Sequence, residues 1–146
     1  MKKLVIDCET TGLSSAHNQL LTLGMVLIDN SKSRMRILKE KHLFVSHDEY
    51  NTNPFAMRVH KINLGEHDQI GISTKKACKE VNNFIDDHDL FDVPVVGHNV
   101  SFDRRFVSAL FEGERKIYPF CDVHEDTRWI WTDLKKQGLA PEYKDA

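Results

Sequence analysis

The 146-residue chain has few of the features that mark secreted, membrane-spanning or disulfide-bonded proteins. It has only three cysteines, Cys8, Cys78 and Cys121, which lie far apart and form no CxxC pair. A sparse, odd set of this kind is typical of reduced intracellular thiols and argues against a disulfide framework or a zinc site. The sequence also has no long apolar run, and its N-terminus enters a predicted strand almost at once. We therefore expect a cytoplasmic protein with no membrane contact.

An excess of charge of one sign is missing as well. The chain has 20 Lys and Arg against 22 Asp and Glu, which gives a formal net charge of −2. This near-neutral total does not by itself predict a nucleic-acid binder, although a local basic face can lie within it. There is no internal repeat, low-complexity segment or linker. The length and the 40% of hydrophobic residues predict one domain over residues 1–146 with a sizeable core.

Apolar patterning predicts an α/β domain with a mixed sheet, because strands come first and then alternate with helices. Strands are expected at 4–9, 20–29, 34–46 and 93–97, with a hairpin turn at 30–33. Helices are expected at 54–61, 73–88, 100–112 and 123–137, with a loop around Gly65 and Gly71. The first three strands follow one another as a meander and should be antiparallel. Charges in the middle of the third predict an edge strand.

Residues 4 to 9 are the stretch around which the chain is predicted to fold. Residues 4 to 6 form an unbroken apolar run, as expected of a strand buried on both faces. Side chains two residues apart on a strand point to the same side, so Asp7 and Glu9 face one way and Cys8 the other. Two like charges held side by side repel each other and are costly to desolvate. This predicts a site for a hard divalent cation, with a pair of ordinary surface carboxylates as the alternative.

A third acidic residue, Asp103, falls on the core-facing side of a later predicted helix. It lies three residues before Phe106 and four before Val107, which belong to the apolar stripe of that helix. An inward-facing acid needs a partner, which could be a buried arginine, an amide or a metal. If the helix packs beside the first strand, Asp103 can meet Asp7 and Glu9. Ligation by carboxylate oxygens alone suits magnesium or manganese.

Two motifs resemble those of a known enzyme family. The segment Val-Ile-Asp-Cys-Glu-Thr-Thr-Gly-Leu at 5–13 closely resembles the first motif of the DEDD (DnaQ-like) exonucleases, the ribonuclease-H-like 3′-to-5′ exonucleases. The segment Val-Gly-His-Asn-Val-Ser-Phe-Asp at 96–103 resembles their second motif, in which the aspartate opens a helix. Residues 59–62 are similar to a short histidine-containing segment that the family carries between them. The order and separation match, so the resemblance covers most of the chain.

The resemblance implies a fold, a reaction and a set of site residues. The expected fold is a ribonuclease-H-like mixed sheet, antiparallel in its first three strands and flanked by helices. Asp7, Glu9 and Asp103 would be the catalytic residues and would hold two Mg²⁺ or Mn²⁺ ions for phosphodiester hydrolysis. The substrate would be the 3′ end of single-stranded DNA or RNA, with a polymerase or another replication or repair protein as a possible partner. The residues expected to contact the strand are Thr10, Gly12, Leu13, Asn99 and Phe102.

Ordinary roles stay open for several of these residues. Asp103 could be the ion-pair partner of a core arginine. Leu13 and Phe102 could be packing residues, and Asn99 could be a helix cap.

The family's third motif is not found in this sequence. In the family it is a C-terminal helix with His, four intervening residues and Asp, or Tyr, three intervening residues and Asp, and it positions the attacking water. Trp129 with Asp133 has the second spacing, but an indole N–H cannot act as a base. Residues 118–131 instead resemble the family's Asp-Thr helix. We therefore predict a C-terminally incomplete domain that lacks the last helix and has weak or no activity.

The C-terminal region contains further candidates with structural explanations. Asp122 with Glu125 has the form of a helix capping box. His124 is expected to be a surface or hydrogen-bonded residue and not a substitute base. Trp129 and Trp131 are two residues apart and cannot both face the core of one helix, so one should be exposed.

Three functions follow from these observations. The first is a 3′-to-5′ exonuclease domain. The second is a catalytically inactive domain that binds nucleic acid or a polymerase, and the third is a hydrolase of small phosphate esters. Metal-dependent thermal stabilisation that Asp7→Ala abolishes would separate the first two.

Overall fold

The computed structural model describes residues 1–30 and 34–139 of the chain. In chain order its elements are β1 (Lys2–Thr10), β2 (Leu20–Asp29), β3 (Arg36–Phe44), α1 (Pro54–His60), α2 (Leu64–Ile70), α3 (Thr74–His88), β4 (Val95–Gly97), α4 (Val100–Gly113), β5 (His124–Asp126) and α5 (Thr127–Lys136). The described strands form a five-stranded sheet in the order β3-β2-β1-β4-β5. β1, β2 and β3 pair antiparallel, whereas β4 and β5 add in parallel. The predicted mixed sheet is confirmed.

Two predictions about the elements were wrong. The loop expected around Gly65 and Gly71 contains the short helix α2, which begins where the Asn63 side chain accepts a hydrogen bond from the Glu66 N–H at 3.1 Å. The helix expected from residue 123 starts only at Thr127, because β5 pairs with β4 immediately before it. β3 and β4 are also shorter than expected. The predicted turn at 30–33 lies, apart from its first residue, outside the described residues.

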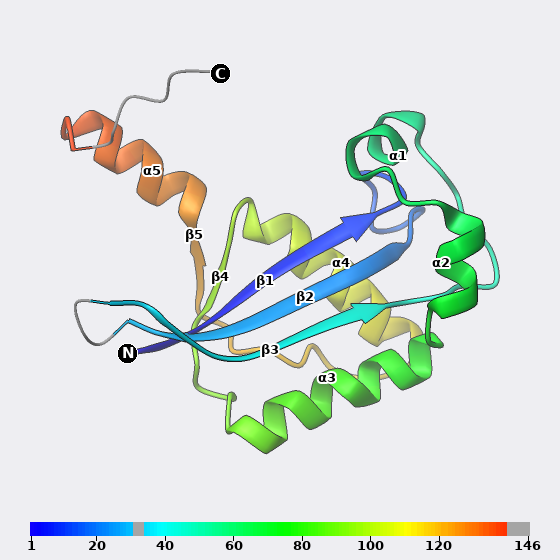
Figure 1. Cartoon of the computed structure of the whole chain (residues 1–146), viewed down its shortest axis with the longest axis horizontal. Helices are drawn as coiled ribbons and strands as arrows, with labels where there is room; N and C mark the ends of the chain where they lie inside the picture. Colours follow the sequence, from blue (N-terminus) through cyan, green and yellow to red (C-terminus); the bar gives the residue numbers. More distant parts are fainter. Residues whose placement is uncertain (31–33, 140–146) are drawn as a thin grey trace.

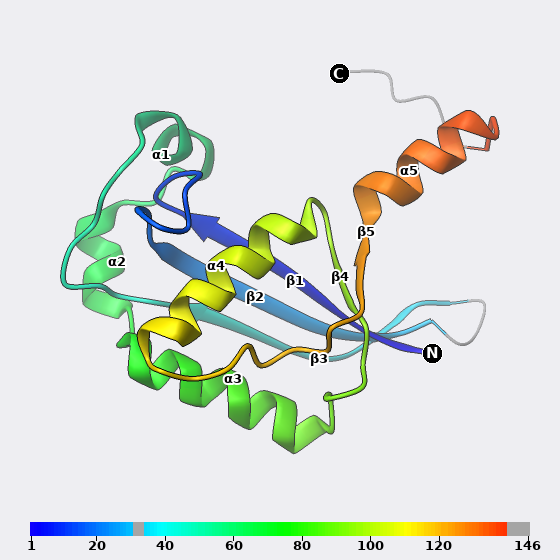
Figure 2. The same ribbon diagram turned by 180° about the vertical axis from the view of Figure 1, so that it is seen from behind.

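β1 buries one face, not two. Leu4, Ile6 and Cys8 are buried on the side of the helices, whereas Asp7 on the opposite side is exposed. The prediction of a strand buried on both faces is therefore wrong. The reason is visible in Figures 1 and 2, where α4 lies behind β1 and β2 in one view and in front of them in the other. No helix drawn in Figure 1 lies across the opposite face of these two strands.

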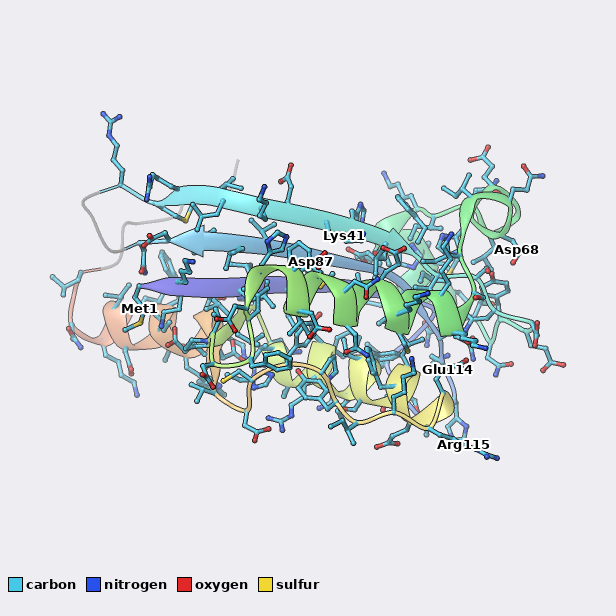
Figure 3. All side chains as sticks on the ribbon, turned by 90° about the horizontal axis from the view of Figure 1, so that it is seen from below. Met1, Lys41, Asp68, Asp87, Glu114 and Arg115 are labelled. Atoms are coloured by element: carbon cyan, nitrogen blue, oxygen red, sulfur yellow. The ribbon has the colours of Figure 1, made fainter. Side chains whose placement is uncertain are left out.

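The core lies between the sheet and the helices α3 and α4. Both helices present the apolar stripes that the sequence predicted: the buried residues are Ala77, Val81, Phe84, Ile85, Phe106, Val107, Leu110 and Phe111. Burying a side chain of the size of Leu or Phe stabilises the fold by about 1.5–3 kcal/mol. β3 is the edge strand, as predicted, and its Lys41 reaches Glu80 of α3 at 2.6 Å (Figure 3).

α5 extends away from the sheet and buries none of its residues (Figures 1 and 2). Trp129 is 60% exposed and Trp131 is half-buried, which confirms that one of the two tryptophans is exposed. No helix within the described ranges combines the length and the apolar character that crossing a bilayer requires.

Candidate active site

Asp7 and Glu9 lie near the end of β1 on the uncovered face of the sheet. In the strand register Asp7 pairs with Gly24, and Gly24 pairs with His42, so the three form a row across β1, β2 and β3. Gly24 has no side chain, and a Cβ placed there would lie 3.9 Å from Cδ2 of His42. The imidazole of His42 therefore lies next to Gly24, near enough to Asp7 for the two groups to interact.

These residues line an open hollow of about 350 Å³ on the sheet surface. Its walls are formed by Asp7, Glu9, Thr22, Gly24, His42, Phe44, His60 and Ile62. His60 ends α1, and its Nε2 lies 2.8 Å from the Thr10 carbonyl oxygen, which brings the helix to the end of β1. The hollow thus combines two carboxylates with two imidazoles contributed by separate elements.

The pKa values of the two carboxylates in the hollow are shifted by partial burial and by the charges of neighbouring groups. Desolvation raises the pKa of Asp7, while the nearby His42 and the Cys8 backbone N–H lower it. Desolvation and the repulsion of Asp7 raise the pKa of Glu9, and His60 lowers it. Within the described residues neither carboxylate forms an ion pair. Their negative charge is therefore compensated only in part by the protein.

Asp103 lies in the first turn of α4 and is buried, at 3% exposure. Its Oδ1 accepts a hydrogen bond from the Cys8 N–H at 2.8 Å, so the carboxylate is held against the residue between Asp7 and Glu9. Desolvation raises the pKa of Asp103 to about 6, the hydrogen bonds from Cys8 lower it, and the repulsion of Asp7 adds to the rise. Of the partners considered from sequence, the structure shows the amide. The described residues contain no ion pair of Asp103 with an arginine.

The three acids are of the right chemical type to bind a metal ion, but their side chains are not gathered around a common point. Carboxylate oxygens with little compensating charge are the ligands that hard cations such as Mg²⁺ prefer. Within the described residues, however, no three His, Cys, Asp or Glu side chains are already gathered into a metal site. The structure brings Asp103 close enough to Asp7 for the two charges to interact, with its Oδ1 bound to the Cys8 amide.

Three of the predicted contact residues follow Glu9 in the chain: Thr10 ends β1, and Gly12 and Leu13 lie in the loop after it. Thr10 is buried and its hydroxyl donates a hydrogen bond to the Gly12 carbonyl oxygen at 2.6 Å. A Cβ at Gly12 would lie 2.4 Å from the Asn18 side chain, so a larger residue there would displace this amide from its hydrogen bonds with the Ser14 N–H and the Asn51 carbonyl oxygen. Leu13 is 68% exposed, and its alternative reading as a packing residue is wrong.

The other two predicted contact residues lie at the start of α4. Asn99 occupies the N-cap position in a left-handed conformation, with φ 58°, but its side chain makes no capping hydrogen bond. The alternative of a capping side chain is therefore wrong. Phe102 is half-buried and packs against the core and Phe106, with ring centroids 4.8 Å apart, which confirms a packing role. Contact of these residues with a nucleic-acid strand stays a prediction.

The C-terminal candidates have structural roles. Asp122 does not cap a helix; its side chain is 94% exposed and reaches Arg104 at 3.6 Å. His124 is hydrogen-bonded, as predicted, with its Nε2 2.8 Å from the Tyr118 hydroxyl. The residue that caps α5 is Asp126, whose side chain accepts a hydrogen bond from the Arg128 N–H at 2.9 Å.

Sequence reasoning missed His42 and Asp126. His42 becomes visible only through strand register, because 34 intervening residues separate it from Asp7 in a chain that gives no local signal for their pairing. Asp126 stands directly before Thr127 and Arg128, and the order Asp-Thr at a helix start could have indicated a cap.

The five-stranded mixed sheet, the carboxylates at the end of its first strand and a match to an exonuclease family model together support a nuclease-like hydrolase. The family model described as "Exonuclease" (RNase_T) matches residues 4–139, and the chain therefore belongs to this exonuclease family. The resemblance inferred from the two motifs is confirmed.

Two curated relatives are DNA polymerases, and this chain matches a small part of each. It is 30% identical over 142 residues to "DNA polymerase III PolC-type" of Halalkalibacterium halodurans, covering 93% of this chain and 9% of the polymerase. It is 27% identical over 145 residues to the PolC-type polymerase of Streptococcus mutans, covering 94% and 9%. The chain thus spans about a tenth of the length of these relatives.

Solved structures of Escherichia coli exonuclease I share the fold. The complex with a dT13 oligonucleotide superposes with a TM-score of 0.75 at 18% identity, covering 99% of this chain and 32% of that one. The zinc-bound form of the complex with single-stranded DNA gives 0.77 at 15% identity, covering 92% and 29%. At this identity the likeness concerns the fold alone, and it confirms the predicted ribonuclease-H-like class.

Proposed function

We propose that this chain is a divalent-metal-dependent exonuclease domain that removes nucleotides from the 3′ end of single-stranded DNA. The observation that carries the proposal is the pair Asp7 and Glu9 on the uncovered face of the sheet, without an ion-pair partner among the described residues and next to buried Asp103. DNA is favoured over RNA because the structural neighbours are complexes with single-stranded DNA and the relatives are DNA polymerases.

Asp7, Glu9 and Asp103 would hold Mg²⁺ or Mn²⁺, with two ions in a complete site. The bound ions would activate a water and stabilise the leaving 3′ oxygen. The chain's own residues contribute position and charge. The Cys8 amide holds the Asp103 carboxylate beside β1, and His42 and His60 flank the other two acids. Thr10, Gly12 and Leu13, together with Asn99 and Phe102, would hold the terminal nucleotides.

The test is an exonuclease assay on a single-stranded oligonucleotide labelled at its 5′ end. With Mg²⁺ or Mn²⁺ we expect slow stepwise shortening from the 3′ end, because the third motif is missing from the sequence, and none in chelator. Asp7→Ala should abolish it, because the ion loses a ligand. Asp87→Ala, which removes an exposed carboxylate of α3, is the matched control and should behave as the wild type (Figure 3). Equal shortening by Asp7→Ala and wild type, or shortening without any divalent ion, would contradict the proposal.

A second candidate is a domain that binds single-stranded nucleic acid, or a polymerase, without cleaving. It is favoured by the absence, among the described residues, of a ready three-ligand group and by the missing third motif. Binding of the oligonucleotide that needs no ion, is unchanged in Asp7→Ala and leads to no shortening would support it. Divalent-ion-dependent thermal stabilisation that Asp7→Ala removes would instead support the nuclease.

A further inference from the structure

Asp126, the last residue of β5, holds the starts of two helices with one carboxylate. Its Oδ1 accepts a hydrogen bond from the Asn99 N–H at 3.0 Å, and its Oδ2 accepts one from the Val100 N–H at 3.2 Å. Oδ1 also accepts the Arg128 N–H at 2.9 Å in the first turn of α5. The Asp126 side chain is 8% exposed, so these bonds are shielded from water. A carboxylate bound to backbone amides in this way makes charge-assisted hydrogen bonds, which are stronger than neutral ones.

The start of α4 needs such support from outside the helix. The first amides of a helix have no partner within it, and a polar side chain at the N-cap position usually supplies one. Asn99 holds this position but its side chain makes no capping bond, and its backbone is left-handed. Asparagine tolerates a left-handed backbone better than most residues with a side chain, but this conformation leaves its side chain without a capping hydrogen bond here. Asp126 supplies an acceptor for the Val100 N–H, the first amide of α4, whereas the Asn99 side chain supplies none.

This helix start also determines where Asp103 lies. Asp103 follows Val100 by three residues, in the same first turn, and its Oδ1 is bonded to the Cys8 N–H at 2.8 Å. The turn sits closely on β4, because a Cβ at Gly97 would lie 3.1 Å from Cβ of Val100. If the turn loosens, the carboxylate leaves its place beside β1.

We infer that Asp126 is a positioning residue of the candidate site, which anchors the first turn of α4 and so holds the Asp103 carboxylate beside Asp7 and Glu9. The inference rests on the proposed function and adds a residue to it. Asp126 itself would touch neither ion nor substrate; it would act through α4. The capping role expected at Asp122 belongs to this residue, four positions later in the chain.

The test measures Mn²⁺ affinity of the full chain through its thermal stabilisation by increasing Mn²⁺. We expect Asp126→Ala to weaken the apparent affinity about tenfold or more, the usual effect of removing a group that orients a metal ligand. Asp126→Asn keeps the shape and one oxygen acceptor and should lie between Asp126→Ala and wild type. Ser73→Ala is the matched control, since the Ser73 Oγ caps α3 by accepting the Lys76 N–H at 3.1 Å. It should lower the melting temperature without changing Mn²⁺ affinity.

The possible outcomes test the role of Asp126 separately from the proposed exonuclease function. If the wild type shows no Mn²⁺-dependent stabilisation, the proposed function falls, and the inference falls with it. If the wild type responds and both Asp126 variants respond equally, the inference alone is overturned. Should Asp126→Ala not fold, Asp126→Asn decides, together with amide hydrogen exchange. Faster exchange at Asn99 and Val100 with weakened Mn²⁺ affinity supports the inference, and unchanged affinity overturns it.

Discussion

Asp103 is a buried carboxylic acid, so its ionised form is energetically unfavourable in the folded protein. It is buried in the first turn of α4, and desolvation raises its pKa from 3.8 to about 6 in the folded protein. Between these two values the folded chain binds more protons at this residue than the unfolded chain does. The contribution of Asp103 to the free energy of unfolding is therefore full below about pH 4 and is lost as the pH rises through about 6.

Asp103→Asn should remove this loss in the absence of divalent ions. Its Oδ1 can still accept the hydrogen bond from the Cys8 N–H, but no charge is buried. At about pH 8 in chelator we expect the variant to be more stable than the wild type by roughly 1–3 kcal/mol, with the gap closing below about pH 4. Urea unfolding over this pH range measures the difference. Asp87→Asn, at an exposed position, is the control, and parallel pH profiles for wild type and Asp103→Asn would contradict the prediction.

His42 offers a second test at the level of one residue. Its charge lowers the pKa of Asp7 across Gly24, against the rise caused by desolvation. His42→Ala should therefore raise the pKa of Asp7, as followed by carboxyl carbon NMR during a pH titration. His17→Ala, which removes an exposed imidazole from the loop after β1, should leave it unchanged. An Asp7 titration that is identical in wild type and His42→Ala would show that the two groups do not interact.

The helices differ in how they are held. α3 and α4 bury apolar stripes, whereas α1 has seven residues and buries none of them. A helix this short is not stable by itself, because nucleation is costly and few hydrogen bonds repay it. α1 depends on its ends: the Asn53 side chain accepts the Phe55 N–H at 2.9 Å, and His60 reaches the Thr10 carbonyl.

Asn53→Ala should consequently make local opening of α1 easier while changing the free energy of global unfolding only slightly. Loss of an N-cap costs about 0.5–2 kcal/mol, and here this cost falls on a helix with few other contacts. We expect faster amide hydrogen exchange within α1 and a small change in melting temperature. Asn63→Ala removes the corresponding cap of α2 and should leave exchange in α1 unchanged. Exchange in α1 that is unaltered by Asn53→Ala would refute the dependence on this cap.

Across the whole molecule, apolar burial is concentrated on one side of the sheet. α3 and α4 cover that side, the opposite face of the sheet carries Asp7 and Glu9, and α5 extends away from both (Figures 1 and 2). The stability of the molecule should therefore depend on the layer between sheet and helices and little on α5.

Two aromatic substitutions compare these regions. Phe111 of α4 is fully buried, and Phe111→Ala should cost about 3–5 kcal/mol through lost burial and a cavity. Trp129 of α5 is 60% exposed, and Trp129→Ala should change the free energy of unfolding by less than about 0.5 kcal/mol. Chemical denaturation measures both. A cost for Trp129→Ala similar to that for Phe111→Ala would show that α5 packs against the body.

Much of this architecture was predictable because local patterns carry it. The apolar stripes of α3 and α4, the antiparallel meander and the charged edge strand follow from the spacing of residues within each element. The wrong predictions concern segments whose structure depends on contacts with residues far away in the sequence. Residues 123–126 have a pattern compatible with a helix, but residues 124–126 pair with β4 and form a parallel strand. Val5 looked buried until the sheet proved to be covered on one face only.

For the site, the residue order alone singled out Asp7, Glu9 and Asp103 as candidates, because a strand alternates its faces and a helix repeats every three or four residues. It also identified the exonuclease family through two short motifs. Only the folded chain showed that the Cys8 amide holds Asp103, that His42 lies across Gly24 from Asp7, and that Asp126 secures α4. The physical reason is that strand register and helix docking join residues tens of positions apart, and these contacts leave no periodic trace in the sequence.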